Sequence, residues 1–392
     1  MGIRVAVIDD NPHVRWRGRV YPENATFGRF LTAFLDLPGA PVASIAHLIP
    51  VRNLPADAPE PATRQLDPRI EVIATAPFDG IAGYVRHLPV IAARNLRPLR
   101  QAIRAADLVW LKVPASNAPF AALVAARKGT PRFGYFAGSV VEVVRGQRRR
   151  GLRGLIARSG ATIYDALAKL ASGPHMVVVG RDLMGAGVVT SLVESAEIRS
   201  PRAEWPRQQG RLSLAWAGRL ANGKGLETVL EAVAASPEVD RVSVLGHGPA
   251  RDRLVANATR LGVADKVRWL GYVSDRPTYL QVLAGADVFV FPSPAEGFPK
   301  VVLDAMAVGL PVIASPAGTL AELVSEGLFE PVPAGDPAAL RAALAGLLAR
   351  PGRAVELSSA GSAFAAAHTR DAEASRLVMF WRAAFPTLPW DT

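Results

Sequence analysis

The chain has 392 residues, half of them hydrophobic and a fifth charged, which is typical of a globular protein large enough for two domains. It contains no cysteine, which excludes disulfides and thiolate metal sites. Residues 1–200 hold 26 Lys/Arg against 15 Asp/Glu, whereas residues 201–392 hold 19 of each. The whole net charge of +11 therefore lies in the N-terminal half, which favours anionic partners.

The beginning of the chain predicts no secretory signal, because its first apolar run is short and ends in two acids. No run of about 18 uncharged apolar residues follows, so we expect no membrane-spanning helix. These features favour a cytoplasmic protein.

Short apolar runs alternate with helical patterns in the N-terminal half. The runs are typical of buried parallel strands and cover residues 3–9, 107–113, 131–137 and 175–180. Residues 27–37 and 119–129 show helical patterns, the second with proline at its start and glycine at its end.

The alternation begins again after residues 195–210, a polar stretch with prolines that we interpret as the interdomain linker. Strands are predicted at residues 211–218, 241–248, 266–272, 286–293 and 311–315, and helices at residues 225–236, 250–262, 299–308 and 336–350. Two such series predict an α/β fold with two doubly wound domains that face each other across a cleft.

Ligands of such sheets bind beyond the carboxyl ends of the strands. Four loops of the second series lie there: Gly218–Arg219 with Lys224, Gly246–His247–Gly248, Gly271–Tyr272–Val273, and residues 295–298. Arg219 offers a forked contact to phosphate and Lys224 a point charge. The alternatives are a solvated surface turn for the first loop and an ordinary loop histidine at His247.

The stretch "EGFPKVVLD" places two carboxylates eight residues apart. Glu296 precedes a helix that Pro299 opens, so the N–H groups near Gly297 and Phe298 form an anion site, or Glu296 only stabilises the helix start. Asp304 interrupts an otherwise apolar helix, and a buried acid needs partners such as the hydroxyls of a sugar or ribose. A side chain at a partly exposed helix edge is the alternative for Asp304.

These motifs, together with "LGHGPARDRLVANATRLGVADKVRWLGYV", resemble the retaining GT-B glycosyltransferases of family GT4. The match is close over roughly residues 211–350 and concerns only the layout before them. The resemblance implies two Rossmann-like domains, with residues 1–198 for the acceptor and residues 199–368 for a nucleotide-diphosphate-sugar. Residues 369–392 would form a helix that crosses back to the first domain. It also implies retention of configuration, with no cofactor and no metal.

The resemblance assigns roles to matching positions. Arg219 and Lys224 would clamp the diphosphate of a UDP- or GDP-sugar, Glu296 would hold the sugar hydroxyls, and we take these three as catalytic. Asp304 would hold the ribose. The donor-binding residues are Gly218, Arg219, Lys224, His247, Tyr272, Val273, Glu296, Gly297, Phe298, Pro299 and Asp304. Fixed positive charge would stabilise the departing nucleoside diphosphate in the transition state.

Three departures from the family pattern limit these assignments. The family has glutamate where this chain has Asp304, which is shorter by one C–C bond, roughly 1.5 Å. Many members carry a histidine that touches the sugar, and Ala137 stands at about that place, followed by Gly138 and Ser139. The glycine-rich loop usual after the first strand is replaced by residues 9–28, which contain two glycines.

No metal site is predicted. The six histidines are scattered along the chain without ligand spacing. Asp9 and Asp10 at the end of the first strand are a tempting pair, but we interpret them as turn and cap residues.

Residues 127–158 hold nine basic residues and one acid, with a peak at Arg145, Arg148, Arg149, Arg150 and Arg153. Interspersed leucine and isoleucine favour an amphipathic segment on an anionic membrane surface, so we expect a peripheral protein on the inner face of the cell membrane. A solvated or acceptor-phosphate-binding face is the alternative. Nucleic acid is disfavoured, because no recognition motif accompanies the patch.

The sequence therefore predicts a bacterial glycosyltransferase that moves a sugar to a lipid-linked or polysaccharide acceptor in envelope or exopolysaccharide biosynthesis. An epimerase or phosphorylase acting on nucleotide sugars with the same fold is one alternative. A non-catalytic nucleotide-sugar-binding subunit is another, suggested by Asp304 and by the absent histidine.

Overall fold

The structure is a computed structural model that divides into two compact units. Unit 1 comprises residues 1–179, 183–190 and 371–392, and unit 2 comprises residues 180–182 and 191–370. The described residues are 2–23, 25–61, 63, 65–78, 83–84, 86–137, 151–180, 187–200, 205–206, 208 and 210–390.

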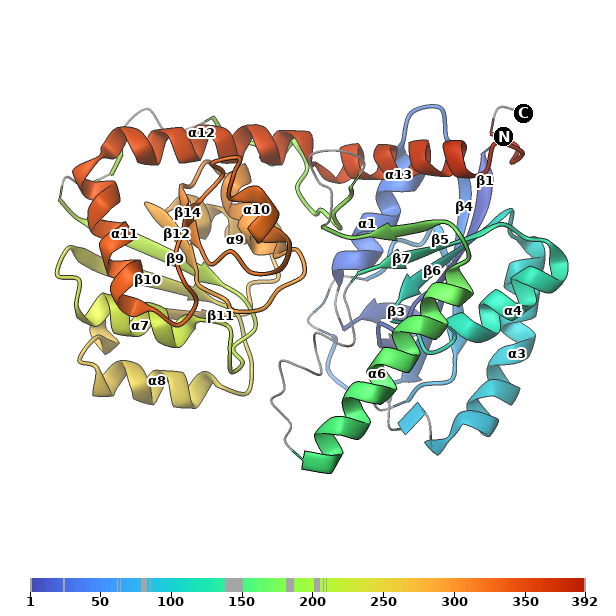
Figure 1. The fold of residues 1–392 in the computed structure, drawn as a ribbon. Coiled ribbons are helices and arrows are strands. Elements are labelled where there is room, and N and C mark those ends of the chain that lie inside the picture. The colour runs from blue at the N-terminus through green and yellow to red at the C-terminus, as the bar shows by residue number, and fades with distance from the viewer. Residues whose placement is uncertain are drawn as a thin grey trace. The chain divides into compact units, whose positions relative to one another are not determined.

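Unit 1 is a mostly parallel sheet with helices on both faces (Figure 1). Its strands are β1 (Ile3–Ile8), β2 (His13–Trp16), β3 (Arg19–Pro22), β4 (Val42–Asn53), β5 (Ile70–Thr75), β6 (Leu108–Val113), β7 (Arg132–Phe136) and β8 (Met176–Val178). They follow the order β3-β2-β4-β1-β6-β7-β8, with β5 beside β4. The described helices are α1 (Ala25–Asp36), α3 (Leu88–Ala105), α4 (Ala118–Lys128), α6 (Gly151–Ser172) and α13 (Arg370–Ala384).

Different helices cover the two faces of this sheet. The face that carries Trp110 packs against α1 and α13, and Trp381 of α13 stacks on Phe34 of α1 with ring centroids 5.3 Å apart. α3 and α4 pack on the opposite face. On that same face α6 packs beside them, because its Ala168 lies against Phe136 of β7. The last helix of the chain is therefore part of the unit 1 core.

The sequence patterns missed several elements of unit 1. The stretch without a glycine-rich loop forms an antiparallel hairpin of β2 and β3. Its turn residues Arg17 and Gly18 both have positive φ, 46° and 80°, as a type I′ hairpin turn requires. β4, β5 and α3 were also not predicted, although α3 has a proline in its first turn.

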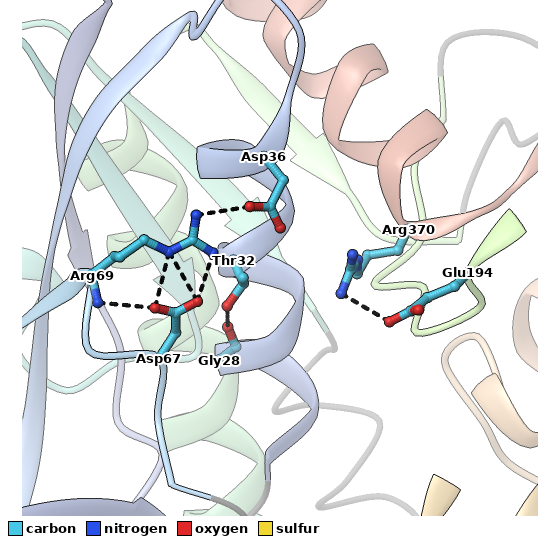
Figure 2. A network of polar contacts seen from close by, with 7 residues as sticks. All are labelled: Gly28, Thr32, Asp36, Asp67, Arg69, Glu194 and Arg370. Atoms are coloured by element: carbon cyan, nitrogen blue, oxygen red, sulfur yellow. Dashed lines mark hydrogen bonds and ion pairs between the residues drawn. The ribbon is translucent and has the colours of Figure 1, made fainter. Parts of the chain in front are cut away.

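Polar contacts fasten the ends of unit 1 elements at the surface. Arg69, just before β5, pairs with Asp67 and with Asp36 at the end of α1, at 2.8 Å each (Figure 2). The Arg69 side chain is half exposed, so these ion pairs contribute little to stability.

Unit 2 is a parallel sheet with the strand order β11-β10-β9-β12-β13-β14. Its strands are β9 (Leu212–Ala217), β10 (Val239–Leu245), β11 (Val267–Gly271), β12 (Val288–Phe291), β13 (Val312–Ala314) and β14 (Glu330–Pro331). Its described helices are α7 (Leu226–Ala234), α8 (Arg251–Arg260), α9 (Arg276–Ala284), α10 (Lys300–Ala307), α11 (Pro337–Ala349) and α12 (Pro351–Ala367). Short 3-10 helices are η1 (Ser195–Glu197), η2 (Ala264–Lys266) and η3 (Gly318–Leu323).

Helix starts in unit 2 follow their sequence signals closely. Asp336 caps α11 by accepting a hydrogen bond from the Ala339 N–H at 2.9 Å, as predicted. Pro299 stands just before α10, which begins one residue later than predicted. The predicted linker lies in unit 2 where it is described, and its Trp205 is buried, with the indole N–H donating to the Asp287 carbonyl at 2.8 Å.

Among the described helices, none is both long enough and apolar enough to cross a bilayer.

Candidate functional site

The loops after β9 and β10 touch at the carboxyl edge of the unit 2 sheet. The Leu220 N–H donates to the His247 carbonyl at 3.1 Å. A Cβ atom on Gly246 would lie 1.8 Å from the Gly218 carbonyl oxygen, so this close approach of two backbones requires glycine. Two of the four predicted ligand loops are therefore adjacent.

The loop after β9 also reaches the loop after β12, and this contact pairs two predicted residues. Gly225 has a φ of +78°, and a Cβ atom there would lie 2.2 Å from the Pro292 carbonyl oxygen. The Lys224 ammonium donates to Glu296 Oε1 at 2.6 Å, and the Ser293 hydroxyl donates to the same oxygen at 2.8 Å. Lysine and carboxylate thus meet across 72 positions of sequence.

This ion pair is accessible to a ligand. The Lys224 side chain is 31% exposed and that of Glu296 is 16% exposed. Both hydrogen bonds that Glu296 makes with described residues fall on Oε1, which leaves Oε2 for a ligand hydroxyl. Arg219, the third predicted catalytic residue, is exposed and forms no ion pair with a described residue. His247 and Tyr272 are exposed at the same edge of the sheet.

The backbone next to Glu296 is held by the start of η3. The Thr319 hydroxyl donates to the Gly297 carbonyl at 2.8 Å. Gly318, with φ +59°, approaches so closely that a Cβ atom would lie 1.8 Å from the Glu296 carbonyl oxygen. The carboxylate of Glu296 therefore stands on a fixed turn, while the anion site predicted at the N–H groups of Gly297 and Phe298 remains a prediction.

Asp304 is buried inside unit 2, so the alternative of a partly exposed helix edge is wrong. Its Oδ1 pairs with Arg276 at 2.8 Å, and its Oδ2 accepts a hydrogen bond from the Tyr279 hydroxyl at 3.2 Å. The partners that we expected from ligand hydroxyls are thus supplied by the protein. Each carboxylate oxygen keeps a second lone pair, and contact with ribose stays a prediction.

Arg276 joins two carboxylates. Its guanidinium makes a forked contact to both oxygens of Glu197, at 2.9 and 2.7 Å, in addition to Asp304. Burial raises the pKa of Asp304, and the charge of Glu197 adds to that rise against the opposing effect of Arg276. Burial opposes the charge of Arg276 as well, but the hydrogen bonds that it donates to Glu197 and the charge of Asp304 raise its pKa.

The Arg276 network extends to the segment that enters unit 2. The Glu194 N–H donates to Glu197 Oε2 at 3.0 Å, and the Glu194 carboxylate pairs with Arg370 at 3.1 Å (Figure 2). Sequence analysis found neither Arg276 nor Glu197. The one usable indication was that a buried acid requires a cation, but nothing in the sequence says which of many arginines provides it.

Unit 1 carries a second polar cluster, at the carboxyl ends of β1 and β6. The Lys112 ammonium donates to Asp9 Oδ1 at 2.6 Å, and His47 lies 3.4 Å from Asp9 Oδ2. The turn role predicted for Asp9 is present, since its carboxylate accepts from the Asn11 N–H at 3.1 Å, but the main role of Asp9 is this buried ion pair. Burial opposes the charge of Asp9, yet Lys112 and His47 lower its pKa well below the usual range.

Asp10 lies beside this cluster. Its carboxylate accepts a hydrogen bond from the Ser116 N–H, so Asp10 ties the end of β1 to the loop after β6. Burial raises the pKa of Asp10 to about 6. Among the described residues, no group of three or more histidine and acidic side chains is arranged to hold a metal ion.

Several predicted positions lie outside the described residues: Gly138, Ser139, Arg145, Arg148, Arg149 and Arg150. Arg153 belongs to α6, and its side chain is likewise not described. Ala137, at the end of β7, donates its N–H to the Val113 carbonyl at 2.9 Å.

Comparison with known proteins gives a family match for the region that contains the candidate site. Residues 211–350 match the model of the family Glycosyl transferases group 1, which confirms the resemblance seen in these motifs. The D-inositol 3-phosphate glycosyltransferase of Segniliparus rotundus is 32% identical over 215 residues, which are 52% of this chain and 47% of that protein. The Rhizobium meliloti lipopolysaccharide core biosynthesis glycosyltransferase LpsE is 41% identical over 98 residues, 25% of this chain and 28% of that protein. The chain spans about half the length of the first of these relatives.

Solved structures share the fold over nearly the whole chain. Sucrose-phosphate synthase from Thermosynechococcus elongatus has a TM-score of 0.67 at 18% identity, covering 98% of this chain and 99% of its own. The Anabaena protein HepE in complex with UDP has a TM-score of 0.64 at 16% identity, covering 98% and 100%. The GT-B fold class expected from the sequence is confirmed by these similarities.

Proposed function

We propose that this chain, whose residues 211–350 match the model of the family Glycosyl transferases group 1, moves a sugar from a nucleotide-diphosphate-sugar to a glycan or lipid-linked acceptor. The observation that carries the proposal is the half-buried pair of Lys224 and Glu296 inside the matched region. A cation and a carboxylate with a free oxygen suit a diphosphate and a sugar hydroxyl, respectively. The names of the relatives, which concern inositol phosphate and lipopolysaccharide core, support glycan biosynthesis.

Residues of unit 2 form the proposed donor site. Lys224 and Arg219 would bind the diphosphate, Glu296 the sugar hydroxyls and Asp304 the ribose. UDP is bound by HepE, and a mycobacterial relative is named as GDP-mannose-dependent, so UDP- and GDP-sugars are both proposed donors. The predicted donor domain of residues 199–368 contains all of these side chains.

The proposed chemistry needs no protein nucleophile and no cofactor. The acceptor oxygen bonds to the anomeric carbon while the bond from that carbon to the diphosphate oxygen breaks, and the acceptor proton leaves with the diphosphate. The positive charges of Lys224 and Arg219 stabilise the negative charge that develops there. We propose same-face attack with retention of configuration and no metal requirement, since the two cations supply the charge.

The acceptor side of the proposal concerns the N-terminal half. Residues 1–198 would bind the acceptor, and residues 369–392 would complete that domain. A cytoplasmic protein held at the inner face of the cell membrane would meet lipid-linked acceptors, and the excess positive charge of the N-terminal half supports this placement.

Two observations favour a second candidate, a non-catalytic nucleotide-sugar-binding subunit. Both Asp304 oxygens already have protein partners, and Ala137 stands where a histidine is common in the family. Such a subunit would bind nucleoside diphosphate without consuming any donor.

Donor turnover separates the two. The purified chain is screened for thermal stabilisation by UDP- and GDP-sugars, and the best donor is then assayed for release of nucleoside diphosphate with and without membrane extract. We expect Glu296→Gln to lower turnover on the order of 100-fold, while nucleoside diphosphate affinity changes less than about twofold. Glu231→Gln, which alters an exposed glutamate of α7, is the matched control.

Two further outcomes are decisive. Tight nucleoside diphosphate binding with no turnover of any donor would establish the binding subunit instead. An NMR measurement of product anomers that shows inversion, or loss of turnover in EDTA, would contradict the proposed chemistry.

A further inference from the structure

Three helices on one face of the unit 1 sheet carry almost only positive charge. α3, α4 and α6 lie on the face opposite α1 and α13 (Figure 1). Their sequences contain nine basic residues and a single acid, Asp165. Much of the positive charge of the N-terminal half therefore lies on these three helices, outside residues 138–150.

The basic side chains described on these helices are available to a partner. All are exposed, and none forms an ion pair with another described residue: Arg94, Arg97, Arg100, Arg104, Arg127, Lys128 and Lys169. On α3 the arginines recur every three or four positions, so they share the face turned away from the buried Ile91 and Leu99. Arg97, Arg100 and Arg104 line a hollow of about 540 Å³, which is large enough for a phosphate group.

α6 adds an exposed apolar stripe. Ile163, Leu167 and Leu170 are separated by four and three residues, so they lie on one side of the helix. Each is at least half exposed, and Leu170 is 77% exposed. The opposite side of α6 packs on the sheet through the buried Ala168. The three exposed side chains therefore contribute little to the packing of α6 on the sheet.

The apolar surface continues on β8. Val177 is buried on the α1 and α13 face, so its neighbours Met176 and Val178 point to the face of α6. Val178 pairs with Phe136, which Ala168 of α6 covers, yet Val178 and Met176 are themselves 40% and 43% exposed. α6 thus covers β7 and leaves the apolar face of β8 partly exposed.

We propose that this surface, formed by the outer sides of α3, α4 and α6 with β8, docks on a membrane of anionic lipids. Apolar side chains of α6 and β8 enter the headgroup region, while arginines of α3 contact lipid phosphates. This lipid face deepens the proposed function, because it places the enzyme at lipid-linked acceptors. Only this access to acceptors rests on the proposed function; binding to the membrane does not.

Charge decides between this occupant and others. A second copy of the chain, packed face to face, would bring two sets of nine cations together, with only one acid in each set. The two positively charged surfaces would repel each other. A nucleic acid would match the charge, but its phosphate backbone would not bury the apolar stripe of Ile163, Leu167 and Leu170. An anionic lipid surface satisfies both the cations and the apolar residues.

Vesicle co-sedimentation of the full chain tests the lipid face. We expect binding to vesicles of phosphatidylglycerol and phosphatidylcholine, little binding to phosphatidylcholine alone, and release by salt. The double change Leu167→Glu with Leu170→Glu should abolish binding. The double change Arg97→Glu with Arg100→Glu should weaken it more than tenfold, since each surface cation contributes about fivefold.

Matched variants keep the test specific. Met379→Glu alters an exposed apolar residue of α13 on the other face, and Arg241→Glu with Arg341→Glu reverses two exposed charges of unit 2. The controls should bind as wild type does. Equal binding by the Leu167/Leu170 variant, an equal loss in the controls, or a wild-type dimer that this variant makes monomeric would overturn the proposal. Nucleoside diphosphate affinity, measured without vesicles, should stay unchanged in every variant, so failure here is distinguishable from failure of the donor site.

Discussion

Unit 1 and unit 2 each place a lysine–carboxylate pair at the carboxyl edge of a parallel sheet, and the pairs have the same length. Lys112 and Asp9 are 2.6 Å apart in unit 1, and Lys224 and Glu296 are 2.6 Å apart in unit 2. Their surroundings differ. The Asp9 side chain is 2% exposed, with His47 at its second oxygen, whereas Glu296 is 16% exposed and keeps Oε2 for a ligand. Contact distance alone therefore does not identify a ligand site; burial and the remaining lone pairs do.

We expect removal of the Asp9 carboxylate to cost much more stability than removal of the Glu296 carboxylate. Asp9→Asn should lower the free energy of unfolding of unit 1 by about 3–5 kcal/mol, because it removes the buried carboxylate that pairs with Lys112, whose side chain is only 18% exposed. Glu296→Gln should cost less than about 1 kcal/mol, since water can solvate Lys224. Urea unfolding, with the transitions of the two units assigned separately, measures both. Similar losses from the two variants would mean that the pairs do not differ in role.

Ligand affinity should depend on the cations of unit 2, Lys224 and Arg219, and not on the buried pair of Lys112 and Asp9. Lys224→Ala and Arg219→Ala should each weaken binding of the nucleoside diphosphate by about 1.5–3 kcal/mol, as expected for charge-assisted contacts to phosphate. Isothermal titration calorimetry measures this, with Arg241→Ala as a control on an exposed arginine of β10. Unchanged affinity in both site variants would remove the diphosphate from this edge of unit 2.

Asp10, which lies beside the buried cluster of Asp9, Lys112 and His47, should make the stability of unit 1 depend on pH. Because the pKa of Asp10 rises to about 6 in the folded state from 3.8, the folded chain binds the extra proton, and unit 1 loses stability as pH rises through this window. Asp9, Lys112, Tyr84 and Tyr164 are the titratable groups that face Asp10.

Asp10→Asn removes this titration and can still accept the Ser116 N–H. Relative to wild type, the variant should gain about 2–3 kcal/mol between pH 3 and pH 7, with the difference vanishing below about pH 3. Urea unfolding of unit 1 across that range provides the measurement. A difference that is constant with pH would show that Asp10 titrates normally.

The two units also differ in how much their sequences revealed. In unit 2 the residues near Glu296 lie on short loops between regular elements, so strand–helix alternation and glycine positions located them. Arg276 and Glu197 were missed because ion pairs over 28 and 79 positions leave no local pattern. In unit 1 the partners Asp9 and Lys112 are 103 positions apart, and each alone resembles an ordinary strand-end residue.

The fold followed the same rule. Most parallel strands of both units were predicted because each is a short apolar run between turn residues, but the parallel strands β4 and β5 were not. The hairpin of β2 and β3 was not, because its Arg17–Gly18 turn lacks the Asn-Gly or Asp-Gly sequence that marks such turns. Local signals therefore located the donor-site candidates, whereas tertiary packing alone brought Asp9, Lys112 and His47 together.

A crystal structure of the full chain with an intact, non-hydrolysable UDP- or GDP-sugar tests the central claim most directly. We expect the diphosphate within hydrogen-bonding distance of Lys224 and Arg219, with a sugar hydroxyl donating to Glu296 Oε2. A ligand bound elsewhere, or one at this edge with the Lys224–Glu296 pair turned away from it, would contradict the account.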